Sequence, residues 1–162
     1  MNNDVLRSVR YMLNVYDETL VSIIQLGSGK ATVEDVRAWL EREDAPGYRE
    51  CPDYVLGWFL DGLIIHRRGP REGGAPRPVD DVVNNNTVLK KLRVAFELRE
   101  EDLAELMAAA GFHVSRPELS ALFRSPTHKN FRHCGDQFLR NFLKSLTARV
   151  RDARRGNILE ND

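Results

Sequence analysis

One pattern occurs twice in this 162-residue chain, at an interval of 83 positions. Three pairs of identical polar residues define the pattern: Arg49 and Arg132, Cys51 and Cys134, and Asp53 and Asp136. The residue before each arginine is aromatic, Tyr48 in the first copy and Phe131 in the second. The apolar positions that follow also match: Leu56, Phe59 and Leu63 correspond to Leu139, Phe142 and Leu146. Internal repetition of this kind predicts a fold built from two copies of one unit.

Each copy of the repeat contains four segments with helical periodicity and none with the period of two that is typical of a strand. The first segment follows a pair of asparagines, which we interpret as helix N-caps. Thr32 and Ser115 are expected to cap the third helix of each copy, and Asp53 and Asp136 the fourth. The sequence therefore predicts an all-α fold of two tandem homologous four-helix repeats, each with a helix-turn-helix-like part.

Composition divides the chain into four segments. We predict helical repeat one at residues 1–66, a linker at residues 67–84, helical repeat two at residues 85–155 and a disordered tail at residues 156–162. Three prolines and three glycines between residues 67 and 81 are typical of an exposed linker. Neither repeat alone is large enough to bury a comfortable core.

Charge is distributed unevenly although the formal net charge is zero. Residues 1–66 carry 6 Lys/Arg against 11 Asp/Glu, whereas residues 85–162 carry 14 against 10. Two interpretations stay open. The basic repeat binds an acidic partner such as nucleic acid, or the acidic and basic repeats attract each other within one chain or between two copies.

The second and third helices of repeat two have the outline of a helix-turn-helix, which presents one helix to a DNA groove. The last helix adds basic residues opposite an apolar stripe, a pattern expected for phosphate contacts and also for an ordinary solvated face. Repeat one instead carries Glu34, Asp35 and Glu41 on the equivalent helix. The candidate nucleic-acid-binding residues are Arg116, Arg124, Lys129, Arg132, Arg140, Lys144 and Arg151.

Catalytic and metal motifs are weak. His128, His133 and Cys134 lie close in sequence, but their spacing matches no structural zinc site and no fourth ligand accompanies them. An enzyme centred on these three residues is the third and least supported hypothesis. We therefore expect no enzymatic activity, no catalytic residue, no metal and no cofactor.

The two cysteines are expected to be buried thiols in a reducing cytoplasm, with a disulfide between them as the alternative. No apolar run approaches the about 20 residues that span a bilayer, and the N-terminus lacks the apolar core of a secretory signal. We expect a cytoplasmic protein without membrane contact.

The chain resembles the YehS-like family of uncharacterised bacterial proteins, which contain two tandem copies of a domain of unknown function. The resemblance rests on four segments: residues 2–11, 48–53, 84–93 and 128–142. It covers nearly all of the chain outside the linker and the last dozen residues. The resemblance implies a small cytoplasmic protein of paired helical domains, and it implies no activity and no functional residues.

We expect a non-enzymatic binding protein that is nucleic-acid-associated or regulatory, acting through a basic face on repeat two. The alternative is a protein–protein interaction adaptor, or a structural protein that forms a homodimer.

Overall fold

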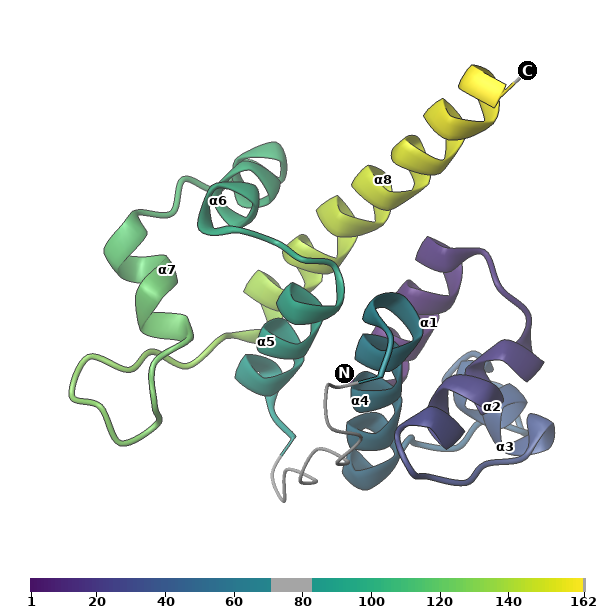
Figure 1. Ribbon diagram of the computed structural model, residues 1–162. Coiled ribbons are helices and arrows are strands. Elements are labelled where there is room, and N and C mark those ends of the chain that lie inside the picture. The colour runs from purple at the N-terminus through teal and green to yellow at the C-terminus, as the bar shows by residue number, and fades with distance from the viewer. Residues whose placement is uncertain (71–82, 162) are drawn as a thin grey trace.

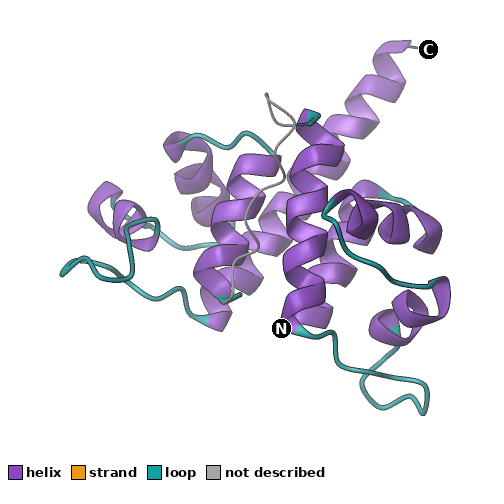
Figure 2. Cartoon of the chain, turned by 60° about the horizontal axis from the view of Figure 1, so that its bottom comes forward, coloured by secondary structure: helices purple, strands orange, loops and turns teal. Residues whose placement is uncertain are grey.

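The computed structural model describes residues 1–70 and 83–161, and within them it contains eight helices in two sets of four (Figure 1). Repeat one consists of α1 (Asn2–Leu13), α2 (Asp17–Leu26), α3 (Val33–Leu40) and α4 (Asp53–Arg68). Repeat two consists of α5 (Asn85–Ala95), α6 (Glu100–Ala109), α7 (Arg116–Leu122) and α8 (Asp136–Asn161). Helices and loops account for all of the described residues, without a strand (Figure 2). The prediction of an all-α fold with two tandem repeats is confirmed.

The first and last helices of each repeat form the centre of the molecule. α1 packs against α8 and α4 packs against α5, so each inter-repeat contact pairs the first helix of one repeat with the last helix of the other. The two contacts are equivalent when the repeats are exchanged, which is the arrangement of an approximate two-fold axis. α2 and α3 lie on one flank of these four helices, and α6 and α7 lie on the other (Figure 1).

One continuous core joins the two repeats. Leu6 on α1, Phe59 on α4, Leu92 on α5 and Phe142 on α8 are all essentially inaccessible to solvent and belong to the same apolar cluster. Burial of apolar surface is the main stabilising term in folding. Each repeat therefore covers the apolar face that the other would expose, and the two share one core.

The outer helices approach the centre more closely in repeat one than in repeat two. A Cβ atom on Gly62 would lie 1.7 Å from the carbonyl oxygen of Ile23, so α2 and α4 touch through their backbones. The equivalent of Gly62 in repeat two is Ser145, and that of Gly27 is Ala110. Because these side chains hold α6 away from α8, a groove of about 620 Å³ lies between the two helices.

Two expectations about helix ends were wrong. Asn2 and Asn3 lie inside the first turn of α1, whose N-cap is Met1, and in repeat two the cap is Asn84. Likewise, Pro52 rather than Asp53 caps α4. The asparagine and aspartate side chains instead bond to partners far away in the sequence. The expected caps of the third helices are confirmed, since Thr32 and Ser115 both form capping boxes.

The structure also differs from the expectation at the ends of repeat two. α8 continues to Asn161, so residues 156–161 are helical where we expected a disordered tail. No proline interrupts residues 136–161, and one glycine costs a helix interior only about 1 kcal/mol. Most of the predicted linker, residues 71–82, lies outside the described residues. Its first two residues, 67 and 68, form the end of α4.

Candidate functional site

The loop between α7 and α8, residues 124–135, carries three of the seven candidate residues and is held at its end by α5. The side-chain amide of Asn86 donates hydrogen bonds to the carbonyl oxygens of Leu122 (3.0 Å) and Arg132 (2.9 Å). Its oxygen accepts a hydrogen bond from the backbone N–H of Cys134 at 2.9 Å. The neighbouring Asn85 donates to the carbonyl oxygen of Cys134 (3.0 Å) and to Asp136 (2.7 Å). We call residues 124–135 the basic loop.

Repeat one builds the same loop, residues 41–52, in the same way. Asn3 donates to the carbonyl oxygens of Trp39 (2.8 Å) and Arg49 (2.9 Å) and accepts from the N–H of Cys51 (3.0 Å). Asn2 donates to the carbonyl oxygen of Cys51 at 2.9 Å and to Asp53 at 2.7 Å. The repeated Arg-x-Cys-x-Asp pattern is thus the part of the loop that the two asparagines hold.

Sequence reasoning missed the role of these asparagines. The available signal was the pair itself, which recurs as Asn2–Asn3 and Asn85–Asn86 at the same 83-residue interval as the cysteines. Amide side chains that recur at the same position in both repeats indicate that they bond to an equivalent partner in each repeat, because an amide both donates and accepts hydrogen bonds.

Arg132 is a structural residue of the basic loop. Its guanidinium forms an ion pair with Glu118 on α7 at 3.0 Å, and Arg49 forms the equivalent pair with Asp35 at 2.8 Å. Hydrogen bonds from the Ser115 hydroxyl and backbone and from Arg132 lower the pKa of Glu118 below its ordinary value. Arg132 therefore fixes the loop against α7. The Glu118 carboxylate partly neutralises the charge that Arg132 would present to a ligand.

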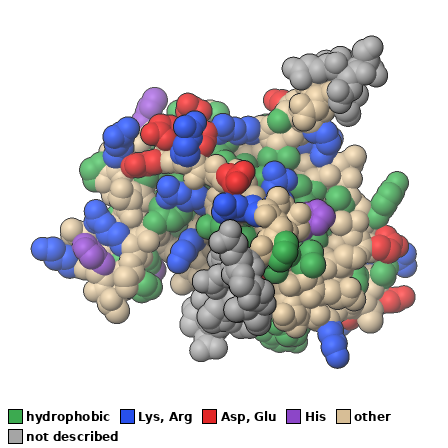
Figure 3. All heavy atoms as spheres, viewed as in Figure 1, with side chains coloured by type: hydrophobic (Ala, Val, Ile, Leu, Met, Phe, Trp, Pro, Cys, Tyr) green, Lys and Arg blue, Asp and Glu red, His purple; other side chains and the backbone are tan. Residues whose placement is uncertain are grey.

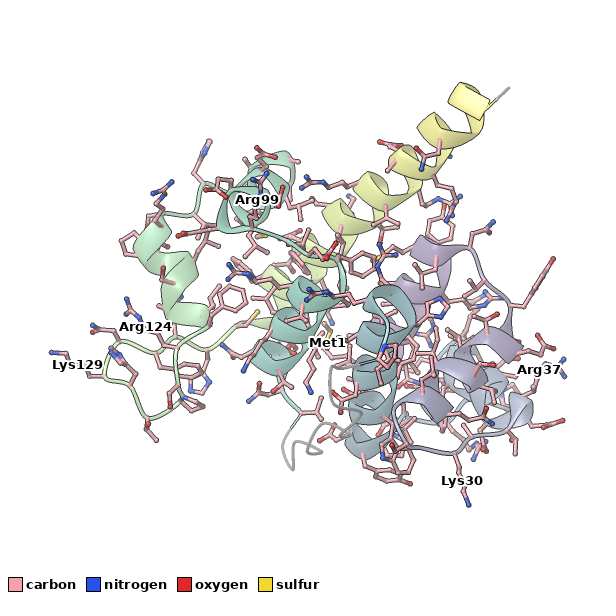
Figure 4. The ribbon with its side chains drawn as sticks, viewed as in Figure 1. Met1, Lys30, Arg37, Arg99, Arg124 and Lys129 are labelled. Atoms are coloured by element: carbon pink, nitrogen blue, oxygen red, sulfur yellow. The ribbon has the colours of Figure 1, made fainter. Side chains whose placement is uncertain are left out.

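Arg124 and Lys129 are the available cations of the loop. Arg124 is half-buried and donates to the carbonyl oxygen of Asn130 at 3.4 Å, whereas Lys129 is exposed and forms no ion pair with any described residue. Both lie at the outer edge of repeat two, with Lys129 extending away from the body (Figure 4). Arg116 is exposed at the first residue of α7, as the helix-turn-helix interpretation requires.

The two loops differ in the sign of their charge. The basic loop contains Arg124, Lys129 and Arg132 and no carboxylate, whereas residues 41–52 contain Glu41, Glu43, Asp44 and Glu50 against two arginines. Lys and Arg side chains also spread over the repeat-two side of the face in Figure 3. The same backbone framework therefore presents an acidic loop in one repeat and a basic loop in the other.

The three candidates on α8 lie apart from this loop and from one another. Arg140 lines a pocket at the start of α1, and Lys144 lines the groove between α6 and α8. Arg151 stacks its guanidinium 4.0 Å from the ring centroid of Tyr11 and donates to the carbonyl oxygen of the same residue at 2.8 Å. A basic side chain at the C-terminal carbonyls of a helix is favoured by the helix dipole. Arg151 thus joins the two repeats and is not a free surface cation.

The histidines and cysteines form no common centre. His128 accepts a hydrogen bond through Nδ1 from the N–H of Asn130 at 3.0 Å, and the ring of His133 packs edge-on against Phe131. Cys134 is buried, and desolvation raises the pKa of its thiol to about 11. Among the described residues, no three His, Cys, Asp or Glu side chains gather closely enough to hold a metal ion.

Both cysteines are free and buried, as predicted. None of the helices in residues 1–70 and 83–161 combines the length and apolarity needed to cross a membrane.

Comparison with known proteins agrees with the repeat. A family model described as "Protein of unknown function (DUF1456)" matches this chain twice, at residues 2–69 and 85–152. The chain is 49% identical over 149 residues to "Uncharacterized protein YehS" from Escherichia coli (strain K12), covering 92% of this chain and 96% of that protein. No solved structure matches. The resemblance seen in the sequence is confirmed, and the chain belongs to the DUF1456 family of tandem-domain proteins of unknown function.

Proposed function

We propose that this protein binds nucleic acid without catalysis, through the basic loop of repeat two. One observation carries the proposal: the same asparagine-anchored loop is acidic in repeat one and basic in repeat two, where it contains three cations and no carboxylate of its own. A cationic surface on an ordered framework is the electrostatic requirement for contact with phosphates. The hydrogen bonds from Asn85 and Asn86 reduce the entropy that the loop loses on binding.

The remaining candidates contribute unequally to this proposal. Arg116 and Lys129 are exposed and form no ion pair with a described residue. Arg132 acts mainly by holding the loop against α7. Arg140, Lys144 and Arg151 lie on α8 in three different surroundings, so we exclude them from the proposed surface.

The test is binding of the purified protein to fluorescently labelled duplex DNA and structured RNA at several salt concentrations. With about three phosphate contacts, the affinity should fall by about 40-fold between 50 and 200 mM salt. The double variant Arg124→Glu, Lys129→Glu should bind at least about tenfold more weakly and show a smaller salt slope. The matched control is Lys30→Glu, which reverses an exposed charge on repeat one and should leave binding unchanged. Absence of binding at low salt would refute the proposal.

The second candidate function is self-association, in which the acidic loop of one copy meets the basic loop of another. The opposite charges of residues 41–52 and 124–135 favour it, and so do the exposed rings of Tyr16 and Tyr54. Sedimentation without nucleic acid separates the two functions. A salt-sensitive dimer that the Arg124→Glu, Lys129→Glu variant abolishes supports self-association, whereas a monomer at all concentrations excludes it.

A further inference from the structure

A pocket of about 730 Å³ opens between the first turns of α5 and the basic loop. Thr87 and Lys90 line it from α5, and Phe123, Arg124, Ser125 and Phe131 line it from the end of α7 and the loop. A volume of this size is in the range of pockets that hold small molecules. Asn86 also lines the pocket, and its hydrogen bonds to the carbonyl oxygens of Leu122 and Arg132 hold the two ends of the segment that forms this wall.

The lining combines two aromatic rings with two cations and contains no carboxylate. Phe123 and Phe131 are both half-buried, and Arg93 covers Phe123 with its guanidinium 4.6 Å from the ring centroid. Lys90 is exposed beside them. Aromatic rings next to basic side chains are how proteins bind single-stranded nucleic acid, because the rings stack on bases while the cations contact phosphates.

Repeat one has the equivalent pocket with the opposite chemistry. It measures about 430 Å³, and Asp4, Glu43 and Glu50 line it. These residues correspond to Thr87, Pro126 and His133 of repeat two. Carboxylates at these positions repel phosphate, so repeat one cannot use its pocket in the same way.

The repeat-one pocket is lined by two cations, Arg7 and Arg140, and the first of them is already engaged within the protein. Arg7 corresponds to Lys90, and it forms an ion pair with Asp4 at 3.1 Å while donating to the carbonyl oxygens of Leu40 and Glu41. Lys90 is exposed instead. At this pair of equivalent positions the cation is therefore engaged within the protein in repeat one and exposed in repeat two.

We propose that the pocket of repeat two binds one nucleotide of a single-stranded nucleic acid, with the base against Phe131 and the phosphate between Lys90 and Arg124. This inference rests on the proposed function and adds to it a preference for unpaired nucleotides. A base inside a duplex is already stacked and paired, so only an unpaired nucleotide can place its ring in the pocket. The protein therefore prefers a single strand to a duplex of the same length.

The experiment measures fluorescence anisotropy of a labelled 12-nucleotide oligothymidine and of a 12-base-pair duplex with the full chain at low salt. Phe131→Leu keeps the apolar bulk and removes the aromatic face, and it should weaken oligothymidine binding by about 5-fold to 100-fold. Phe131→Tyr restores the ring and should bind within about twofold of the parent. Lys90→Ala should weaken binding. It should also reduce the slope of log affinity against log salt concentration by the amount expected for one phosphate contact.

Tyr48→Leu is the matched control, because it removes the ring at the equivalent position of repeat one and should leave binding unchanged. A thermal unfolding curve for each variant separates loss of the ring from loss of the fold. The nucleotide-pocket proposal would be overturned if Phe131→Leu left oligothymidine binding unaltered, or if the protein preferred the duplex. Either result would leave the proposed function standing. Absence of binding to both probes would overturn both.

Discussion

The side chain of Lys91 on α5 donates a hydrogen bond to the carboxylate of Asp61 on α4, and this ion pair is buried where the two repeats meet. Lys91 is 8% exposed and Asp61 is 5% exposed. The exchange-related positions on α1 and α8 hold Ser8 and Lys144, which cannot form such a pair. The buried charges therefore distinguish the α4–α5 contact from the α1–α8 contact, in the way that a buried polar residue fixes the register of helices.

Removing one member of this pair should cost far more than removing both. Asp61→Ala removes a charge-assisted hydrogen bond from the buried ammonium and should lower the free energy of unfolding by about 1.5–3 kcal/mol. The double variant Asp61→Leu, Lys91→Met replaces both charges by apolar groups and should recover most of that loss. Urea denaturation measures both values. A double variant as unstable as Asp61→Ala would contradict this account.

Gly62 should tolerate no side chain. A Cβ atom there would lie 1.7 Å from the backbone oxygen of Ile23, which cannot move without displacing α2. Gly62→Ala should therefore destabilise the protein by about 3 kcal/mol. Gly57→Ala is the matched control in the same helix, because its Cβ would lie 3.4 Å from a methyl group of Val83. The free energy of unfolding of Gly57→Ala should differ from that of the parent by no more than about 1 kcal/mol, because alanine is more favourable than glycine in a helix interior.

Acid should weaken the attachment of both loops. The backbone N–H of Thr32 and the guanidinium of Arg49 lower the pKa of Asp35, and the Ser115 hydroxyl is the main cause of the lowered pKa of Glu118. A carboxylate whose pKa is lowered in the folded state adds stability above its unfolded pKa. That stability is lost as the pH falls below about 4.

Thermal unfolding between pH 7 and pH 3 measures this effect. The double variant Asp35→Asn, Glu118→Gln should have a lower Tm at pH 7 and a shallower decline towards pH 3. Glu34→Gln removes a charge from an exposed position on α3 and serves as the control. A decline in the double variant as steep as in the parent would assign the acid sensitivity to other groups.

The two cysteines should resist alkylation in the folded protein. Burial raises the pKa of the Cys51 thiol to about 12 and that of Cys134 to about 11. The reactive thiolate is therefore scarce at pH 8, and the sulfur atoms are covered. Mass spectrometry after iodoacetamide treatment should find neither cysteine modified in buffer and both modified in urea. Rapid labelling of folded Cys134 would contradict this expectation and favour the hypothesis of an enzyme centred on His128, His133 and Cys134.

The sequence contained enough information for the elements of this fold because those depend on short-range rules. The repeat, the four helices of each copy and the caps at Thr32 and Ser115 all follow from spacing and local hydrogen bonding. The same rules misled at Asn2 and Asn3, whose partners lie 36–51 residues away. A local rule assigns a helix cap wherever an asparagine precedes an apolar run. It takes no account of hydrogen-bond partners in a loop that is distant in the sequence.

The candidate site was predictable only in part for the same reason. The sequence predicts Arg124 and Lys129 as nucleic-acid-binding residues, and the structure places both in the loop between α7 and α8. Arg151 looked equivalent to them on the polar side of its helix, yet it binds Tyr11, 140 residues away in the chain. The pocket beside Phe131 left no signal of its own, because its walls come from α5 and from the segment after α7.

The pairing of α1 with α8 also orders events during synthesis. α1 leaves the ribosome well before α8, so its apolar face stays without its partner while the rest of the chain is made. The part of the core that α1 and α8 share can therefore close only after α8 has been made. A product that stops before α8 leaves exposed the part of α1 that α8 covers, although α3 and α4 still pack against α1.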